Sequence, residues 1–449
     1  MEKIKNAYLA EVFEEVRERD PHETEFQQAV YEVLDSLAPV IEQRPDIAKS
    51  GVIRRLVEPE RSIIMRVPWV DDAGEIRVNR GYRVQFNSAI GPYKGGIRFH
   101  PSVNLSIIKF LGFEQTFKNC LTTMPMGGGK GGADFDPKGK SDGEVMRFCQ
   151  SFMTELYRHI GQFTDSPAGD IGVGAREIGY MYGQYKRIAN EVDGTITGKA
   201  PFYGGSLGRT EATGYGLCYF ASHALAAMGE SFAGKTVAIS GSGNVATYAH
   251  VKATELGAKV VTMSDSNGYV YDEEGIDLGV VRAIKDGRRG RIAEYVEARP
   301  GAVYKDNCKD IWSVPCDIAL PCATQNEVTE KDARLLKENG CILVAEGSNM
   351  SSTPEAVGYM LSEGLTYCLG KAANAGGVTV SWLEMSQNSM RLPLTFQEVD
   401  VKLQKIMGDI FKGAAEAART FGMEGNYVAG ANIASFMKIA QAMMAQGCC

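Results

Sequence analysis

The spacing of apolar residues predicts helices at both ends of the chain. Apolar residues recur every three or four positions between 9 and 16 and again between 26 and 37. Because Pro21 lies between these two runs and proline interrupts a helix, we expect two separate helices. The same spacing returns from 395 to 445, which predicts long helices near the C-terminus.

Between these helical regions the pattern changes to strands. Residues 61–69 and 75–86 read as two strands, and the intervening 71–74 (Asp-Asp-Ala-Gly) is a typical turn, so we expect an antiparallel hairpin. Further on, Ser141 and Glu144 have the spacing of a capping box ahead of an apolar helical run. This predicts a long, partly buried helix.

From about residue 200 short β-branched runs alternate with helical segments, which is typical of a parallel, doubly wound sheet. The expected strands are 236–240, 259–263, 317–320 and 341–345. We therefore expect an α/β protein with a first domain over 1–200 that contains a mixed sheet, and a doubly wound domain over 201–373. A helical segment over 374–449 should pack back on the first domain.

Composition narrows the class of protein. Hydrophobic residues make up 44% of the 449 positions and charged residues 23%, which is ordinary globular usage and excludes a disordered, fibrous or disulfide-scaffold protein. The 48 Lys and Arg against 55 Asp and Glu give a net charge of −7, so we expect neither nucleic acid nor an anionic membrane surface as a partner.

Location and metals are judged from what the sequence lacks. No apolar run reaches the roughly 18 residues of a membrane span, and the first twenty residues mix acids and bases, unlike a targeting peptide. The ten cysteines form no C-x-x-C pair, which favours a reducing compartment. We expect a cytoplasmic protein without a metal, because the five histidines are widely scattered.

A glycine-rich turn follows the first strand of the doubly wound domain and leads into a helix. It consists of Gly241, Ser242, Gly243, Asn244, Val245 and Ala246. In such a turn the first glycine permits the bend, the second lets the backbone approach a pyrophosphate, and the helix N-terminus supplies free amides. With a second strand about 20 residues further on, the pattern predicts a dinucleotide site.

The choice between NAD and NADP stays open on these residues alone. Asp265, at the end of the second strand, would hold ribose hydroxyls and repel a 2′-phosphate. Ser264 and Ser266, however, can donate to a phosphate. A basic cluster that could fold over this phosphate, or simply form a solvated loop, contains Lys285, Arg288, Arg289 and Arg291.

The first domain holds lysines in glycine-rich surroundings. The segments are 91–98, 115–118, 126–132 and 167–170. Glycines let backbone and ammonium approach a small ligand together, and several lysines suit a dicarboxylate. Like charges lower one another's pKa, which would make one of these lysines available as a neutral base. The alternatives are surface lysines for Lys94 and Lys118 and a helix cap for Asp170.

Taken together, these segments resemble the hexameric glutamate dehydrogenase family over essentially the whole chain. The matching stretches are 92–99, 121–132, 167–170, 211–216, 241–246, 321–326 and 374–378. The resemblance implies that Lys130 and Asp170 are catalytic and that Lys94 and Ser381 hold the side-chain carboxylate of glutamate. It also implies a set of further binding residues: Gln115, Lys118 and the Gly169 backbone at the α-carboxylate and reacting end, Arg209 near the same cleft, and Thr213, Asn244 and Asn374 around the nicotinamide and pyrophosphate.

The Gly241 turn with Ser264–Ser266 resembles the NADP-using branch of the family. The resemblance implies a homohexamer that interconverts L-glutamate with 2-oxoglutarate and ammonium using NADP, mainly in the direction of reductive amination. Thr210 and the segment 347–351 depart from the usual pattern, and we expect these departures to alter local rigidity only. The alternatives are an NAD-linked glutamate dehydrogenase, another amino-acid dehydrogenase, and a non-catalytic protein that kept the fold.

Overall fold

The computed structural model describes residues 4–448, and the chain folds into two compact units. Of the described residues, the first unit contains 4–207, 378–399 and 432–448, and the second contains 208–377 and 400–431. The expected return of the whole tail to the first domain is therefore wrong. The segment 400–431 packs within the second unit, and only 378–399 and the end of the chain from 432 belong to the first.

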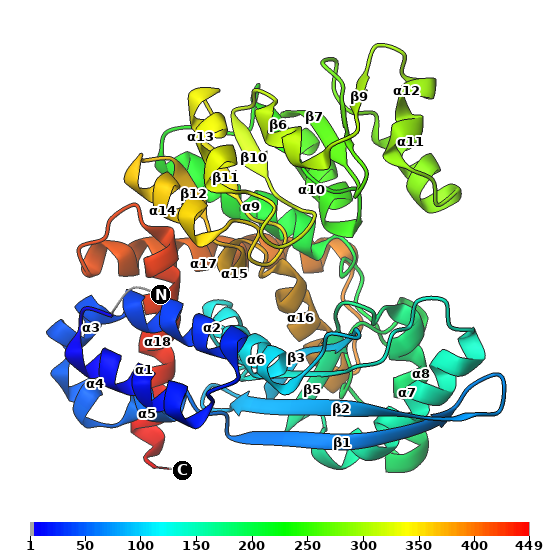
Figure 1. Cartoon of the computed structure of the whole chain (residues 1–449), viewed down its shortest axis with the longest axis vertical. Helices are drawn as coiled ribbons and strands as arrows, with labels where there is room; N and C mark the ends of the chain where they lie inside the picture. The colour runs from blue at the N-terminus through cyan, green and yellow to red at the C-terminus, as the bar shows by residue number, and fades with distance from the viewer. Residues whose placement is uncertain (1–3, 449) are drawn as a thin grey trace. The chain divides into compact units, whose positions relative to one another are not determined.

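The two N-terminal helices are present as predicted. α1 (Ala7–Arg19) is capped by Asn6, whose Oδ1 accepts from the amides of Tyr8 and Leu9. α2 (Thr24–Ser36) begins after the break at Pro21. Short helices α3 (Ala38–Gln43), α4 (Pro45–Lys49) and α5 (Val52–Leu56) follow, and Figure 1 shows all five gathered in blue beside the end of α18 (Tyr427–Gln446).

The first unit is built on a five-stranded mixed sheet in the order β1-β2-β4-β3-β5. Its strands are β1 (Arg61–Val70), β2 (Ile76–Asn87), β3 (Tyr93–Phe99), β4 (Gly128–Ala133) and β5 (Asp165–Gly169). β1 and β2 form the predicted antiparallel hairpin, and β4 continues antiparallel to β2. β3 runs parallel to both β4 and β5, so the carboxyl ends of these three strands meet at one edge of the sheet.

The strands β3, β4 and β5 fall in the glycine-rich segments, which the sequence did not predict as strands. Their glycines serve packing: a Cβ on Gly95 would overlap the carbonyl oxygen of Gly129, and one on Gly128 would overlap the side chain of Thr116. Thr116 belongs to α6 (Leu105–Leu121), which lies close against β4 and β2. The glycines therefore let this helix and the neighbouring strands approach one another.

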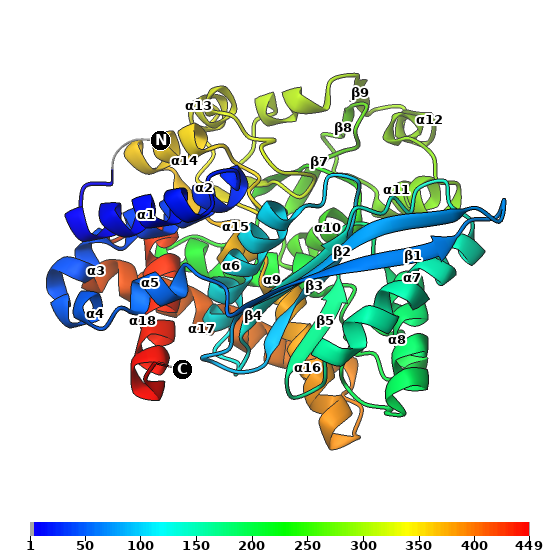
Figure 2. The same cartoon turned by 60° about the horizontal axis from the view of Figure 1, so that its bottom comes forward.

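Two helices pack against the opposite side of this sheet. α7 (Asp142–Leu156) begins with the predicted capping box of Ser141 and Glu144, and α8 (Ala175–Ala189) follows it. Figure 2 shows both helices along the sheet, where their apolar residues join a buried cluster that includes Trp69 and Phe99. The cluster fixes the sheet that carries the candidate catalytic groups.

The second unit contains a seven-stranded sheet in the order β12-β11-β10-β6-β7-β8-β9. The four predicted strands are confirmed within one or two residues as β6 (Thr236–Ile239), β7 (Lys259–Ser264), β10 (Ile318–Leu320) and β11 (Leu343–Ala345). They pair in parallel, and β12 (Thr366–Cys368) extends them. The short strands β8 (Tyr269–Tyr271) and β9 (Val303–Lys305) add an antiparallel edge that the sequence did not predict.

Helices lie on both faces of this second sheet, as a doubly wound fold requires. α13 (Glu330–Glu338) and α14 (Pro354–Ser362) share a buried cluster with strand residues such as Ala319 and Val344, while α9 (Ala212–Ala227) and α10 (Asn244–Glu255) contact β6, β7 and β11 (Figure 1). The remaining helices are α11 (Leu278–Arg282), α12 (Tyr295–Ala298), α15 (Gly370–Ala373), α16 (Gly376–Met390) and α17 (Phe396–Thr420).

Over residues 4–448, no helix combines the length and apolar character needed to cross a membrane. Within the same residues no group of three His, Cys, Asp or Glu side chains is arranged to hold a metal ion. The cysteines from Cys120 to Cys448 all carry free thiols.

Candidate active site

Three charged side chains meet on the parallel strands β3 and β4 and directly after β5. Lys130 of β4 donates from Nζ to Asp170 Oδ1 at 2.9 Å, and Arg98 of β3 donates from Nε to Asp170 Oδ2 at 2.7 Å. Asp170 follows β5 directly, and the parallel pairing of β3 with both neighbours brings the three residues together. Lys130 is only 4% exposed. Lys130 and Asp170, which the resemblance implies are catalytic, therefore lie in direct contact.

The chain turns sharply after β5, and this turn fixes Asp170. The amide of Val173 donates to the carbonyl of Asp170 at 2.9 Å, and Gly172 adopts a left-handed φ of 74°. A Cβ on Gly172 would overlap the carbonyl oxygen of Phe99 in β3. Gly169, predicted to contribute its backbone, is equally restricted, because a Cβ there would lie 2.6 Å from the carbonyl oxygen of Val173. Glycine is therefore required on both sides of the aspartate.

Burial and charge give this pair opposite properties. The pKa of Lys130 is lowered mainly by burial. The charges of Arg98 and Arg83 lower it further, whereas Asp170 opposes the shift. Burial alone would raise the pKa of Asp170, but Lys130 and Arg98 outweigh it and hold that pKa well below its usual range. We expected neighbouring lysines to lower the pKa of Lys130, but burial and two arginines do so instead.

Arg98 was not among the predicted site residues, although it ends the segment 91–98. Nothing in the sequence shows that β3 lies between β4 and β5, so the partner of Arg98 could not be named in advance. Asn119 was missed for the same reason. Its Nδ2 donates to the carbonyl oxygens of Lys94 at 2.9 Å and Gly127 at 2.6 Å, which ties α6 to the strands.

Lys94 lies inside the first unit and not on its surface. The residue is 1% exposed, and its Nζ donates to Ser166 O at 3.0 Å, Pro167 O at 3.4 Å and Thr197 Oγ1 at 2.8 Å. These oxygens fix the direction of the buried Lys94 side chain. The alternative of a surface lysine is wrong for Lys94.

The other predicted substrate residues of the first unit lie on two helices. Gln115 and Lys118 are half-buried and three positions apart on α6, so they share one face. Gln115 Nε2 donates to Asn119 Oδ1 at 2.6 Å. Ser381 is buried on α16, within the part of that helix that belongs to the first unit.

The predicted dinucleotide turn lies at the carboxyl end of β6. Gly241 has a left-handed φ of 83°, and its amide donates to Ser264 Oγ at 2.7 Å. Ser242 and Val245 are half-buried, and Gly243 and Asn244 are exposed at the start of α10, where a Cβ on Gly243 would meet nothing within 4 Å. The strand order reverses between β6 and β10, which is where doubly wound sheets bind ligands.

Asp265 is engaged with its own domain. Its Oδ2 accepts from the amide of Ile292 at 2.8 Å and from Lys285 Nζ at 3.3 Å. Burial alone would raise the pKa of Asp265, but the amides of Ile292 and Asn267 and the charge of Lys285 lower it. The negative charge of the carboxylate is therefore partly offset by these donors, and it repels a phosphate less.

The remaining residues of the predicted phosphate pocket are divided in role. Ser266 and Arg291 are exposed and meet, because Arg291 Nη1 donates to Ser266 Oγ at 3.1 Å. Arg288 Nη2 lies 3.6 Å from Glu294 Oε2. Ser264 is buried, and its hydroxyl supports the turn by accepting from Gly241. Ser266 and Arg291 are thus the residues best placed to meet a ligand.

Three further predicted residues belong to the second unit. Arg209 and Thr213 lie together, because a Cβ on Gly377 would be 2.7 Å from Thr213 Oγ1 and 3.5 Å from Arg209 Nη1. Asn374 Nδ2 donates to Gly347 O at 3.2 Å and to Asn349 Oδ1 at 2.9 Å. The unusual segment 347–351 therefore contacts a predicted cofactor residue directly, which goes beyond the expected change in local rigidity.

Comparison with known proteins supports the same family. The sequence models of Glutamate/Leucine/Phenylalanine/Valine dehydrogenase and of the Glu/Leu/Phe/Val dehydrogenase dimerisation domain match residues 204–447 and 59–187. The chain is 55% identical to an NADP-specific glutamate dehydrogenase of Helicobacter pylori, over 98% of this chain and 100% of that one. It is also 55% identical to an NAD-specific glutamate dehydrogenase of Porphyromonas gingivalis, over 98% of this chain and 99% of that one.

A solved structure is equally similar. The crystal structure of a Plasmodium falciparum glutamate dehydrogenase has a TM-score of 0.96 and 53% identity, covering 98% of this chain and 95% of that one. The fold, the two matching domain models and the identity over almost the whole length agree. The chain belongs to the Glu/Leu/Phe/Val dehydrogenase family.

Proposed function

We propose that this protein is an NADP-dependent glutamate dehydrogenase that interconverts L-glutamate with 2-oxoglutarate and ammonium. The observation that carries the proposal is the contact of buried Lys130 with half-buried Asp170, which also binds half-buried Arg98. A buried lysine with a lowered pKa, held by an ionised aspartate, is suited to exchange protons with a reacting substrate. Lys94 supplies the charge that favours an acidic side chain.

The residues of the second unit fit a dinucleotide with a 2′-phosphate. The open approach to Gly243 and the exposed start of α10 suit a pyrophosphate. Ser266 and Arg291 offer a hydroxyl and a guanidinium, and Lys285 offsets the charge of Asp265. NADP is therefore favoured over NAD, although equally similar relatives are named for either cofactor.

The residues of the chain divide the chemistry as follows. When bound, the nicotinamide supplies the acceptor or donor of a hydride at the α-carbon of the substrate. Lys94 and Ser381 hold the distal carboxylate, while Gln115 and Lys118 hold the α-carboxylate. These contacts fix the α-carbon, and correct orientation of this kind lowers the barrier by several kcal/mol.

Proton transfer falls to the buried pair. In oxidative deamination the α-carbon becomes an iminium, and neutral Lys130 accepts a proton from the water that attacks it. Asp170 stays ionised beside the Arg98 guanidinium, so it orients neutral Lys130 and stabilises the ammonium that forms on it. Protons then pass to the departing ammonia. Reductive amination reverses these steps, and we propose it as the main direction, with assimilation of ammonium as its purpose.

We also propose that the protein is a homohexamer in the cytoplasm. β1 is an edge strand, and exposed apolar residues lie on one face of the hairpin: Ile64, Val70, Ile76 and Val78. Val70 and Ile76 are directly paired, and Ile76 is 74% exposed. An exposed apolar edge of this kind is usually covered by a subunit contact. Ile76→Glu should reduce the mass measured by light scattering below six times that of the chain.

The test of the activity is the loss of NADPH absorbance with 2-oxoglutarate and ammonium, run in parallel with NADH. We expect turnover with both substrates present and none when either is omitted. A higher kcat/KM with NADPH supports the cofactor assignment, and a preference for NADH would overturn it. No turnover with either cofactor would contradict the proposed function.

A further inference from the structure

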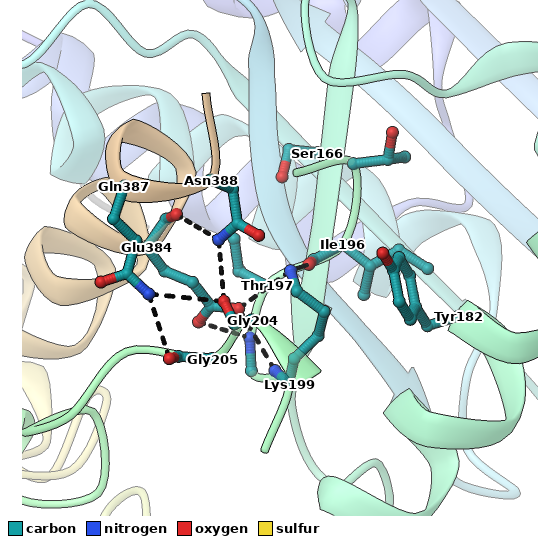
Figure 3. A network of polar contacts seen from close by, with 12 residues as sticks. Ser166, Tyr182, Ile196, Thr197, Lys199, Gly204, Gly205, Glu384, Gln387 and Asn388 are labelled. Atoms are coloured by element: carbon teal, nitrogen blue, oxygen red, sulfur yellow. Dashed lines mark hydrogen bonds and ion pairs between the residues drawn. The ribbon is translucent and has the colours of Figure 1, made fainter. Parts of the chain in front are cut away.

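A buried ion pair lies in the first unit, outside the residues assigned to chemistry. Lys199 Nζ is 3.1 Å from Glu384 Oε1, and both side chains are completely buried. Lys199 also donates to the carbonyl of Ile196 and lies over the ring of Tyr182 (Figure 3). Taking two charges out of water costs about as much as their attraction returns, so stability alone does not explain the pair.

Several donors converge on the carboxylate of Glu384. The amide of Gly198 donates to Oε2 at 2.9 Å, and the amide of Lys199 donates to Oε1 at 3.3 Å, in addition to the Lys199 ammonium. An ionised carboxylate accepts on both oxygens, whereas an amide side chain would present an NH2 group to one set of donors. The Glu384 carboxylate therefore holds the backbone at Gly198 and Lys199 in place.

The segment held by Glu384 reaches Lys94. Thr197 Oγ1 accepts from Lys94 Nζ at 2.8 Å, and the amide of Thr197 donates to Pro167 O at 3.0 Å. The direction of the Lys94 ammonium thus depends on a threonine whose neighbouring amides are fixed by Glu384.

The same glutamate lies one turn from Ser381. Both belong to α16, and a spacing of three residues places them on one face, about 4.5 Å apart along the helix axis. Further along α16, Gln387 Nε2 donates to Gly205 O at 3.0 Å, and Asn388 Nδ2 donates to Gly204 O at 2.8 Å. Figure 3 shows these side chains reaching from the helix to the loop after Lys199. α16 is therefore held in one position along residues 196–205.

We propose that Lys199 and Glu384 are a positioning pair that sets the separation of Lys94 and Ser381, and so selects substrates with a distal carboxylate. The inference rests on the proposed function, in which Lys94 and Ser381 hold that carboxylate. A displacement of about 1 Å in a binding group can lower the rate by about a hundredfold. The pair acts through other residues and touches no substrate itself.

The test compares two substrates of equal length. Glu384→Gln is assayed with ammonium and NADPH on 2-oxoglutarate and on 2-oxopentanoate, which carries a methyl group in place of the distal carboxylate. The substrate ratio is the kcat/KM for 2-oxoglutarate divided by that for 2-oxopentanoate. We expect this ratio to fall by about tenfold or more in Glu384→Gln, with the KM for NADPH unchanged. A purely structural role would lower both rates alike, and an unchanged ratio overturns the proposal.

A second variant keeps the test decisive if Glu384→Gln folds poorly. Lys199→Met combined with Glu384→Leu removes both charges, so its thermal midpoint should be nearer to that of the unmodified protein. We expect its substrate ratio to stay low. A restored ratio would show that the ion pair is not needed and would also overturn the proposal.

The control breaks a different buried ion pair of the same unit. Lys109 Nζ is 2.7 Å from Asp20 Oδ2, and Lys109→Met should lower the thermal midpoint while leaving the substrate ratio unchanged. A lowered ratio in this control would mean that the ratio reports general loosening, against the proposal. If the unmodified protein does not turn over 2-oxoglutarate, the proposed function itself fails. If it does and Glu384→Gln keeps the normal ratio, only the positioning role fails.

Discussion

Replacing Lys130 tests the chemical centre most directly. Lys130→Ala removes the ammonium that lies 2.9 Å from Asp170, and Lys130→Met does so with little change in volume. A positioned general base contributes about a hundredfold to ten-thousandfold to a rate. We expect kcat to fall by about a thousandfold, which corresponds to about 4 kcal/mol of lost transition-state stabilisation.

The pH dependence of the rate of glutamate oxidation gives a second test of Lys130. Burial lowers the pKa of Lys130, so the fraction of neutral lysine rises with pH at a lower pH than for an ordinary lysine. The rate of glutamate oxidation in the unmodified protein should therefore rise with pH and level off above the pKa of Lys130. In Lys130→Met this ionisation is absent, and the rise attributable to it should disappear.

The assay follows NADPH formation from glutamate between pH 6 and pH 10, and the dissociation constant for NADP is measured separately. We expect cofactor binding to survive, because Lys130 belongs to the first unit and the dinucleotide turn to the second. Lys138→Met, at an exposed position eight residues further on, is the matched control and should retain full activity. A Lys130→Met variant within tenfold of the normal kcat, or with the same pH profile, would refute the assignment of the base.

Other expectations follow from the same geometry. Lys94→Leu should lower kcat/KM for glutamate by about a hundredfold or more and raise it for leucine, as separate assays of both amino acids would show. Arg291→Ala should weaken the binding of NADPH by about tenfold and that of NADH little. This difference should shrink with added salt, because Arg291 is exposed. Equal losses of affinity for both cofactors would contradict the phosphate assignment. Burial raises the pKa of Glu346 from 4.5 to about 7, so the folded state binds its proton more tightly than the unfolded state. Stability should therefore fall by up to about 3 kcal/mol as the pH rises from 5 to 8, and thermal unfolding of Glu346→Gln should lack this slope.

The sequence predicted those elements whose own residues determine their structure. The helix α7 has its capping box and apolar face within one segment, and the hairpin of β1 and β2 has alternating strands around a turn of Asp and Gly. The core strands β6, β7, β10 and β11 are rich in β-branched or aliphatic residues, which mark a buried strand without any knowledge of its neighbours. Local chemistry was sufficient in each case.

The features that the sequence did not predict depend on partners far along the chain. Arg98 has a role only because β3 lies between β4 and β5, and Asp265 is partly neutralised only because residues 285–292 fold back to it. The division of the C-terminal helices between two units likewise depends on tertiary packing, since their helical spacing is the same in both. Local sequence patterns thus identify candidate residues but do not show which of them are in contact in the folded chain.

The glycines of β3 and β4 explain why the candidate site was visible in the sequence while its strands were not. A strand of glycines lacks the side chains by which a strand is normally recognised. On β4 the glycines at 129 and 131 flank Lys130, and the close approach of α6 and of the neighbouring strands leaves this lysine buried. Burial then lowers the pKa of Lys130, and the close approach of α6 brings Gln115 against β3, where a Cβ on Gly95 would lie 3.2 Å from Gln115 Cγ. Close packing and an unusual lysine thus have one cause, which is the absence of side chains beside it.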